Sequence, residues 1–237
     1  MNRRDLIGTW DLRIMLGNKG PGFDVCWITL PFSGLADVQL SAEYIATAIP
    51  YLAKLSPATN HKINVIGHSQ GGGSNTQWAL TFWPSIRPYI INYIALSATF
   101  KGSNEVKLLC KVQDGVGGCP PALLQLESTS NYVAAQNSDV DEFSGAHSHV
   151  PTTSIYSRYD EAVQWEGFGG VINSFLNGST MIALQDERVC GKFHITTHIE
   201  MLQDSAAYSL VLDALINGRP TNITNFDKKD CHHGRGD

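Results

Sequence analysis

Residues 64–75, "NVIGHSQGGGSN", constrain the fold of this chain more than any other stretch. A short apolar run leads into Gly67-His68-Ser69-Gln70-Gly71, more glycines follow, and "NTQWALTFW" then has the composition of a helix ended by a proline. A G-x-S-x-G pattern is weak alone. A strand directly before it and a helix directly after it predict a tight, strained turn that lifts the serine above a sheet edge. The residues two before and two after the serine then need to lack bulk.

Such a turn predicts that Ser69 is a nucleophile. The helix that follows directs its free N–H groups and its dipole at the site, where both favour negative charge. The backbone N–H of Gln70 is then one donor to a tetrahedral oxyanion. The alternative is a glycine-rich strand–helix turn whose serine only caps the helix.

A serine hydroxyl needs a base, and the base needs an orienting carboxylate, in the chain order Ser, Asp or Glu, His. Asp160 follows an apolar strand at 152–157, which places it at the carboxyl edge of the sheet, where sites of α/β proteins lie. Glu161 is the neighbouring candidate. Either carboxylate is alternatively a solvated surface charge.

Among the eight histidines, we expect His198 to be the base, because it stands between a strand and the last helix, with Thr197 as a plausible cap. His194 is the second candidate, although its apolar neighbours are more typical of a packed strand residue. His68 lies inside the turn and precedes the acid. The remaining histidines lie in polar loops or the tail and are interpreted as surface residues: His61, His147, His149, His232 and His233.

Apolar and β-branched runs predict strands at 23–30, 63–67, 90–98, 152–157 and 179–184. Three helices are expected: one after Asp37, one at 75–83 and one from about 198 to 216. The first has an apolar face of Leu40, Tyr44, Ala48 and Leu52, with Ile45 and Ile49 beside them. This alternation predicts one α/β domain over residues 1–237, with a mostly parallel sheet flanked by helices on both faces. Residues 101–150 break the pattern and predict a cap-like segment with short helices at 122–127 and 131–137.

A net charge of −5 provides no basic excess to bind phosphates, so we expect no nucleic-acid partner. No apolar run approaches the ~20 residues of a membrane span, and no cysteine spacing indicates a metal site. The N-terminus is basic but lacks a continuous apolar region, so no signal peptide is visible in this chain. The five cysteines are reduced thiols of an intracellular protein or partners in disulfides; sequons at 177–179 and 222–224 weakly favour secretion.

Further stretches occur in one order over roughly residues 24–231: "DVQLSAEYI", "SQGG" followed by "QWALTFWPSIRPYI", "FKGS", "VPTTSIYSRYDEAVQ" and "VCGKFHITTH". In these stretches the chain resembles the Candida antarctica lipase B type of fungal lipases, an α/β-hydrolase family. The resemblance implies the same roles by position: Ser69 as nucleophile, Asp160 as acid, His198 as base and Gln70 as oxyanion donor. It also implies a disulfide between Cys190 and Cys231, which leaves Cys110 and Cys119 to pair locally.

The chain also departs from the family pattern. Its first 25 residues resemble the helix that follows the family's first strand and oxyanion loop, so we expect that strand, that loop and the partner of Cys26 to lie outside this chain. The family's C-terminal extension is not visible either. Thr99 stands where the family has an acidic residue lining the pocket. Since one lost oxyanion donor costs on the order of 10²–10³ in rate, we expect turnover by this chain to be impaired.

The resemblance implies a serine carboxylic ester hydrolase, a secreted lipase that cleaves acylglycerols and other fatty-acid esters without a metal or cofactor. We expect a monomer that meets a lipid or other ester substrate at an interface. One alternative is an esterase for short acyl or polyester substrates. Another is a non-catalytic hydrolase-fold protein that binds a lipid or a partner. The terminal tripeptide 235–237, "RGD", is attributed to chance.

Overall fold

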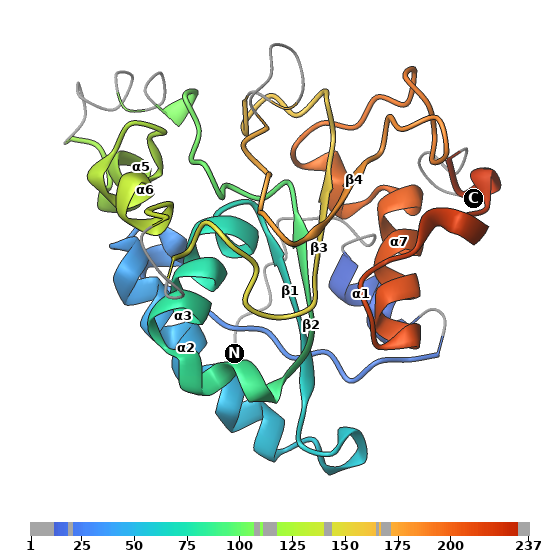
Figure 1. The fold of residues 1–237 in the computed structure, drawn as a ribbon, viewed down its shortest axis with the longest axis horizontal. Helices are drawn as coiled ribbons and strands as arrows, with labels where there is room; N and C mark the ends of the chain where they lie inside the picture. Colours follow the sequence, from blue (N-terminus) through green and yellow to red (C-terminus); the bar gives the residue numbers. More distant parts are fainter. Residues whose placement is uncertain are drawn as a thin grey trace.

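The computed structural model describes residues 12–18, 21–106, 110, 118–139, 144–164, 166 and 172–231. In these residues one four-stranded parallel sheet has the order β1-β2-β3-β4 (Figure 1), formed by β1 (Ile63–His68), β2 (Ile90–Leu96), β3 (Thr152–Tyr156) and β4 (Thr180–Ala183). The strands predicted at 63–67, 90–98, 152–157 and 179–184 are therefore confirmed. Because all four strands run in one direction, their carboxyl ends and the loops that follow meet at one edge.

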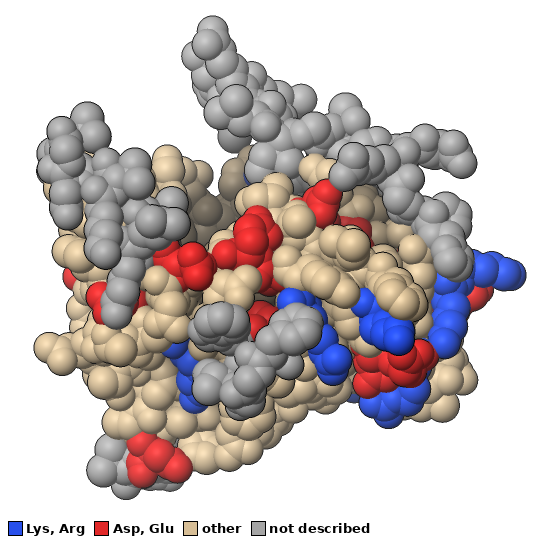
Figure 2. Space-filling view, turned by 90° about the horizontal axis from the view of Figure 1, so that it is seen from above, with Lys and Arg blue, Asp and Glu red and all other residues tan. Residues whose placement is uncertain are grey.

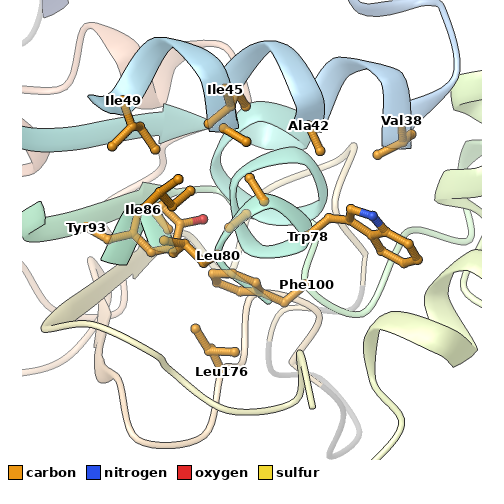
Figure 3. Packing of buried hydrophobic residues seen from close by; sticks show 14 of the residues in the cluster. Val38, Ala42, Ile45, Ile49, Trp78, Leu80, Ile86, Tyr93, Phe100 and Leu176 are labelled. Atoms are coloured by element: carbon orange, nitrogen blue, oxygen red, sulfur yellow. The ribbon is translucent and has the colours of Figure 1, made fainter. Parts of the chain in front are cut away.

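Helices cover both faces of this sheet, as the alternating pattern predicted. Figure 1 shows α2 (Val38–Lys54) and α3 (Thr76–Phe82) on one side, and α1 (Leu12–Asn18) and α7 (Ser205–Asn217) on the other. Strand β2 supplies both cores, because successive side chains point to opposite faces. Tyr93 and Ala95 are buried in the core under α2 and α3, shown in Figure 3, whereas Ile94 and Leu96 are buried in the core under α7.

Helix α2 begins as expected, but only part of the expected apolar face is buried. The Asp37 carboxylate accepts hydrogen bonds from the N–H groups of Gln39 at 2.8 Å and Leu40 at 3.2 Å, which caps the helix. Leu40 and Tyr44, on the expected apolar face, are 40% and 48% exposed. Ile45 and Ile49, expected beside that face, are buried, and the buried stripe continues through Val38 and Ala42 rather than through Leu40 and Tyr44. Its alanine lets α3 approach closely, which periodicity alone does not reveal.

The strand predicted at 23–30 is wrong: within the described residues this segment belongs to no ladder. Phe23 and Val25 pack against the core under α7, while Ile28 and Leu30 pack against the core under α2. The segment therefore passes from one side of the sheet to the other instead of running alongside a strand. A short apolar, β-branched run requires only an extended chain with covered side chains, whereas a strand also needs a neighbouring backbone.

The last helix starts later than expected. Helix α7 begins at Ser205, where Asp204 accepts a hydrogen bond from the Ala207 N–H at 2.9 Å and caps it, and Gly218 ends it in the left-handed conformation. Thr197 is not a helix cap; its N–H and hydroxyl both donate to the Glu200 carboxylate. His198 consequently lies in a loop, followed by a short 3₁₀ turn (Glu200–Leu202).

The region predicted as cap-like contains two short helices near the expected positions, α5 (Pro121–Leu126) and α6 (Asn131–Gln136). Residues 107–109, 111–117 and 140–143 of this region lie outside the described residues, as do His232, His233 and the tripeptide 235–237. Shorter helical turns occur at Pro31–Gly34, Pro57–Thr59, Gly71–Asn75, Pro84–Tyr89, Ile223–Asn225 and Lys228–Cys231. None of the described helices is long and apolar enough to cross a bilayer.

Two disulfides are present. Cys190 pairs with Cys231 and ties the loop after β4 to the segment that follows α7, and Cys110 pairs with Cys119. Cys26 is exposed and has no disulfide partner among the described residues. The pairings are those that the family resemblance implied.

Candidate active site

Ser69 lies at the turn between β1 and the helical segment that leads into α3. Its φ is 55°, in the left-handed region that a residue with a side chain rarely adopts. The π-helical turn Gly71–Asn75 follows and runs directly into α3. A strained backbone angle at a polar residue, held between a strand and a helix, points to function and matches the predicted strained turn.

The glycines of this turn are required, but not all at the expected positions. A Cβ at Gly67 would lie 2.5 Å from the Gly71 carbonyl oxygen, and one at Gly72 would lie 2.2 Å from the Gly67 carbonyl oxygen. A Cβ at Gly73 would lie 2.2 Å from the Thr99 nitrogen. Around Gly71 nothing lies within 4 Å, so the expectation that the residue two after the serine must lack bulk is wrong. The close approach occurs one and two residues later, where the helical turn crosses β1 and the loop after β2.

This difference gives a prediction. Gly72→Ala is expected to lower the free energy of unfolding by about 3 kcal/mol or more, because the new methyl group would overlap backbone that cannot move aside. Gly71→Ala is expected to be neutral or slightly stabilising, because the site is open and alanine favours a helix. Urea unfolding of both variants measures this, and equal losses would contradict the geometry of the turn.

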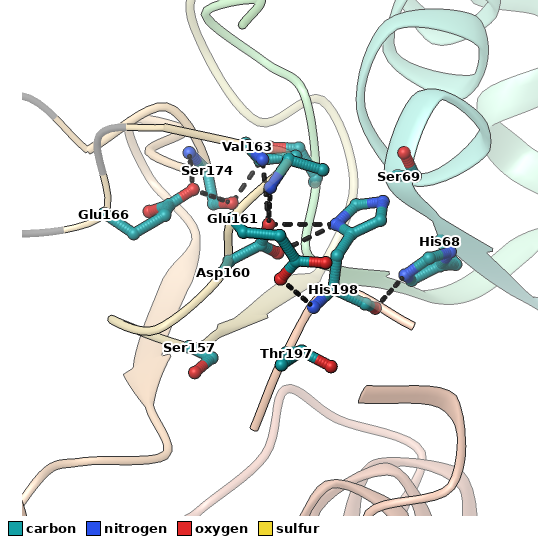
Figure 4. Close-up of polar contacts among 12 residues, drawn as sticks. His68, Ser69, Ser157, Asp160, Glu161, Val163, Glu166, Ser174, Thr197 and His198 are labelled. Carbon is teal, nitrogen blue, oxygen red and sulfur yellow. Dashed lines mark hydrogen bonds and ion pairs between the residues drawn. The ribbon is translucent and has the colours of Figure 1, made fainter. Parts of the chain in front are cut away.

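Asp160 and His198 form a buried pair at the carboxyl edge of the sheet (Figure 4). The His198 Nδ1–H donates to both carboxylate oxygens of Asp160, at 2.9 and 3.0 Å, and the residues are 7% and 1% exposed. Asp160 Oδ1 also accepts from the N–H groups of Ala162 and Val163, at 3.0 and 2.8 Å. Burial alone would raise the pKa of Asp160, but these hydrogen bonds and the attraction of His198 outweigh it and hold the pKa below its usual value.

Glu161 also contacts His198, but through the backbone. Its Oε2 accepts a hydrogen bond from the His198 N–H at 2.9 Å. The two acid candidates therefore divide the contacts: Asp160 holds the imidazole ring and Glu161 holds the main chain that carries it. Asp160 alone of these two carboxylates is placed to orient the ring.

His68 was set aside because it precedes the acid in the chain, yet it lies directly against His198. The two rings are 4.5 Å apart, and His68 Nε2–H donates to the His198 carbonyl oxygen at 2.9 Å. Burial and the charge of His198 lower the pKa of His68 to about 4, so it is neutral at pH 7. Its position inside the pentapeptide could have indicated this contact, because the residue before the serine shares the sheet edge.

The His68 contact brings the His198 ring next to the turn that carries Ser69. Figure 4 shows the ring on the side of the His198 main chain that faces Ser69. No hydrogen bond between the Ser69 hydroxyl and His198 is formed in the described part of the chain. Such contacts are often long in the absence of substrate and shorten when it binds.

Gln70 fixes the other side of the turn. Its side-chain amide donates to the Gly34 carbonyl at 3.0 Å and to Asn75 Oδ1 at 3.2 Å, which holds the 3₁₀ turn Pro31–Gly34 beside Ser69. Thr99 lies behind the turn, where its N–H donates to the Ser69 carbonyl at 3.4 Å. Its hydroxyl lies 2.9 Å from the hydroxyl of Ser74.

His194, the second base candidate, belongs to a separate pair and not to a strand. Its Nε2 lies 2.7 Å from Asp204 Oδ2, and the side chains are 14% and 9% exposed. The other described histidines lie outside this region. His147 contacts Asp139 at 2.7 Å near the surface, and the half-buried His149 lies 3.3 Å from the Thr81 hydroxyl.

Glu166 is a buried carboxyl group behind Asp160 that the sequence did not single out (Figure 4). It is 2% exposed, and Oε1 accepts from the Ser174 N–H and hydroxyl at 3.0 and 2.6 Å. Burial raises its pKa to about 8, and the Ser174 hydrogen bonds offset this only in part. The group is therefore protonated in the folded protein at pH 7.

The raised pKa of Glu166 predicts a pH-dependent stability. Its contribution is complete below the pKa of the unfolded chain, near 4.5, and is lost as pH rises towards 8. The free energy of unfolding is expected to fall between these values with a slope approaching about 1.4 kcal/mol per pH unit. Glu166→Gln is expected to flatten this profile, whereas Glu187→Gln, at an exposed position, should not. Identical profiles for Glu166→Gln and the wild type would contradict this.

Figure 2 shows the face above the carboxyl ends of the strands. Asp and Glu side chains gather around its middle, and Lys and Arg side chains lie beside them, below the middle and towards one border.

Comparison with known proteins agrees with this geometry. The chain is 32% identical to lipase B of Pseudozyma antarctica over 197 residues, which cover 82% of this chain and 53% of that protein. The crystal structure of Aspergillus fumigatus lipase B superimposes with a TM-score of 0.71 at 29% identity, over 86% of this chain and 48% of that one. The chain is therefore similar to these lipase B proteins, and it has an α/β-hydrolase fold. No family model matches.

A more distant structure supports the fold alone. Bacillus licheniformis lipase BlEst2 superimposes with a TM-score of 0.53 at 13% identity, over 78% of this chain and 75% of that one. The chain spans about half the length of the two lipase B proteins that it matches.

Proposed function

We propose that this chain acts as a serine carboxylic ester hydrolase, with Ser69 as nucleophile, His198 as general base and Asp160 as the orienting acid. The observation that carries the proposal is the buried Asp160–His198 pair, joined through His68 to the turn on which Ser69 stands. The relatives are lipases, which favours fatty-acid esters such as acylglycerols as the substrate class.

In the proposed mechanism His198 Nε2 takes the proton of the Ser69 hydroxyl as its oxygen attacks the ester carbonyl carbon. The imidazolium that forms is stabilised by the Asp160 carboxylate, and its proton then goes to the leaving alcohol. Water repeats the sequence on the acyl-enzyme and releases the carboxylic acid. The Gln70 N–H, at the start of the helical segment, is proposed to donate to the oxyanion.

Two features support a secreted, lipid-directed protein. Disulfides such as Cys190–Cys231 persist in oxidising compartments. The loop that carries His198 also exposes large apolar side chains, Phe193, Ile195 and Ile199, at 83%, 69% and 54%. We propose that the protein is secreted and works as a monomer at the surface of an ester substrate.

Fluorophosphonate labelling tests the proposal, because it counts single attacks by an activated serine and does not require high turnover. We expect the probe to label the 237-residue chain on Ser69 only, and Ser69→Ala to remain unlabelled. p-Nitrophenyl esters of increasing acyl length then define the substrate: a preference for long chains indicates a lipase, and one for short chains indicates a short-chain or polyester esterase. An unlabelled but folded chain would refute catalysis and leave a binding protein.

A further inference from the structure

The two loops that carry the proposed acid and base leave neighbouring parts of the sheet. Strands β3 and β4 are adjacent and parallel, with Tyr156 opposite Ala183. The acid loop, residues 157–160, follows β3 directly. Gln185 follows β4 at the same level, because the Leu184 N–H donates to the Tyr156 carbonyl and continues the ladder. The base loop, residues 194–198, comes later and has no strand pairing to hold it.

Gln185 is 3% exposed, and its side chain contacts both loops. Its Nε2 donates to the Ser157 hydroxyl at 3.0 Å and to the His194 carbonyl at 2.7 Å. Its Oε1 accepts the Arg158 N–H at 2.8 Å. Both N–H groups and the carbonyl oxygen of the amide are therefore used, with the acid loop on one side and the base loop on the other.

The base loop is anchored on its other side as well. Asp204 Oδ2 accepts hydrogen bonds from His194 Nε2 and from the Thr196 hydroxyl, each at 2.7 Å, while Asp204 Oδ1 caps α7. Hydrogen bonds thus run without a break from the first turn of α7 through His194 and Gln185 to the acid loop. The planar amide of Gln185 is the link in this series that joins the two loops.

We infer that Gln185 is a positioning residue, which sets the spacing of the acid and base loops so that His198 Nδ1 meets Asp160. The inference rests on the proposed function for its kinetic consequences. Catalytic groups work when they are held within about 0.5 Å of productive geometry. Glu161 holds the His198 main chain, and Gln185 holds the residue four positions earlier, so the loop is fixed at both ends.

Gln185→Met tests this, because methionine has nearly the same length and makes none of the hydrogen bonds. We expect kcat to fall by about 10²-fold, as a misplacement near 1 Å can cause, with KM changed by less than about threefold. The acidic limb of the pH–kcat profile should move to lower pH, because a poorly aligned Asp160 stabilises the imidazolium less. Gln203→Met, at an exposed position before α7, is the matched control and should behave as the wild type.

A second variant separates positioning from simple loss of stability. Gln185→Glu keeps an acceptor for the Arg158 N–H but, when ionised, cannot donate to the His194 carbonyl; we expect a kcat between those of the wild type and Gln185→Met. All rates are measured well below each variant's unfolding midpoint. A folded Gln185→Met enzyme with kcat within about threefold of the wild type would overturn the inference.

Proton NMR provides a readout that does not depend on turnover. The His198 Nδ1–H proton, donated to a buried carboxylate, is expected at low field in the wild type and in Gln203→Met, and to weaken or disappear in Gln185→Met. An unchanged signal in Gln185→Met overturns the inference even if kcat falls. Loss of the signal in a chain that shows no esterase activity supports the positioning role and refutes the proposed function instead.

Discussion

Asp160→Asn is expected to lower kcat for ester hydrolysis by on the order of 10⁴-fold, with little change in KM. The N–H groups of Ala162 and Val163 both donate to Asp160 Oδ1. In the variant they would hold the amide oxygen in that place and turn the amide NH₂ towards His198. The NH₂ group then occupies the Oδ2 position, 2.9 Å from Nδ1, and competes with the amide oxygen 3.0 Å away. It favours the tautomer with the ring proton on Nε2, which cannot accept the proton of Ser69. The variant is thus expected to fold and to hold the wrong tautomer.

Glu161→Gln is the matched control for Asp160→Asn. Glutamine keeps a carbonyl oxygen that can accept the His198 N–H, so we expect less than about a tenfold loss in kcat. Fluorophosphonate labelling should follow the same order, slow in Asp160→Asn and nearly normal in Glu161→Gln. If Glu161→Gln lost as much activity as Asp160→Asn while both remained folded, Asp160 would not be the sole orienting acid.

The strands and the turn at Ser69 could be predicted because local sequence determines them. Four short apolar, β-branched runs that alternate with helical segments predict the strands of a covered parallel sheet. Close backbone contact between Gly67 and the residues at 71–72 leaves glycine as the residue that fits there. These features depend mainly on residues near one another in the chain, whereas the contact of Gly73 with Thr99 does not.

Features that depend on distant partners could not be predicted in this way. Residues 23–30 have the apolar, β-branched composition of a strand, but no neighbouring backbone pairs with them in the described structure. Helix α2 has two apolar stripes, and only the position of α3 decides which is buried. Gln185 has no motif that links it to His194, because this contact joins two loops at the sheet edge; only the position of His68 before Ser69 could have indicated its contact with His198.

The choice of base shows the same limit. His194 and His198 lie on one loop, and each has an aspartate partner: Asp204 for His194 and Asp160 for His198. The sequence favoured His198 by its place after a strand, but it did not show that each histidine has an aspartate partner. The structure separates them by their neighbours, because the ring of His198 contacts His68 beside Ser69, whereas His194 contacts the cap of α7.

His198→Ala and His194→Ala turn this difference into a measurement. His198→Ala is expected to lower kcat by on the order of 10⁴–10⁶-fold, because it removes the ring proposed to take the Ser69 proton. His194→Ala removes one of the hydrogen bonds that Asp204 accepts while those from Thr196 and the Ala207 N–H remain. We expect it to lower the free energy of unfolding by about 1–3 kcal/mol and kcat by no more than about tenfold.

Steady-state kinetics at a temperature where both variants are folded, together with urea unfolding, separate the two roles. We expect the larger loss of kcat in His198→Ala. In His194→Ala we expect a loss in the free energy of unfolding, because this variant weakens the anchor of the loop. If His194→Ala were folded and as inactive as His198→Ala, the base would be misassigned, or the anchor at α7 would control the pair far more tightly than its hydrogen bonds indicate. Labelling of Ser69 distinguishes these outcomes. If the base is misassigned, the acylation of Ser69 in His194→Ala should be slow at every pH. If the anchor is loosened, the rate should be partly restored when the substrate orders the loop.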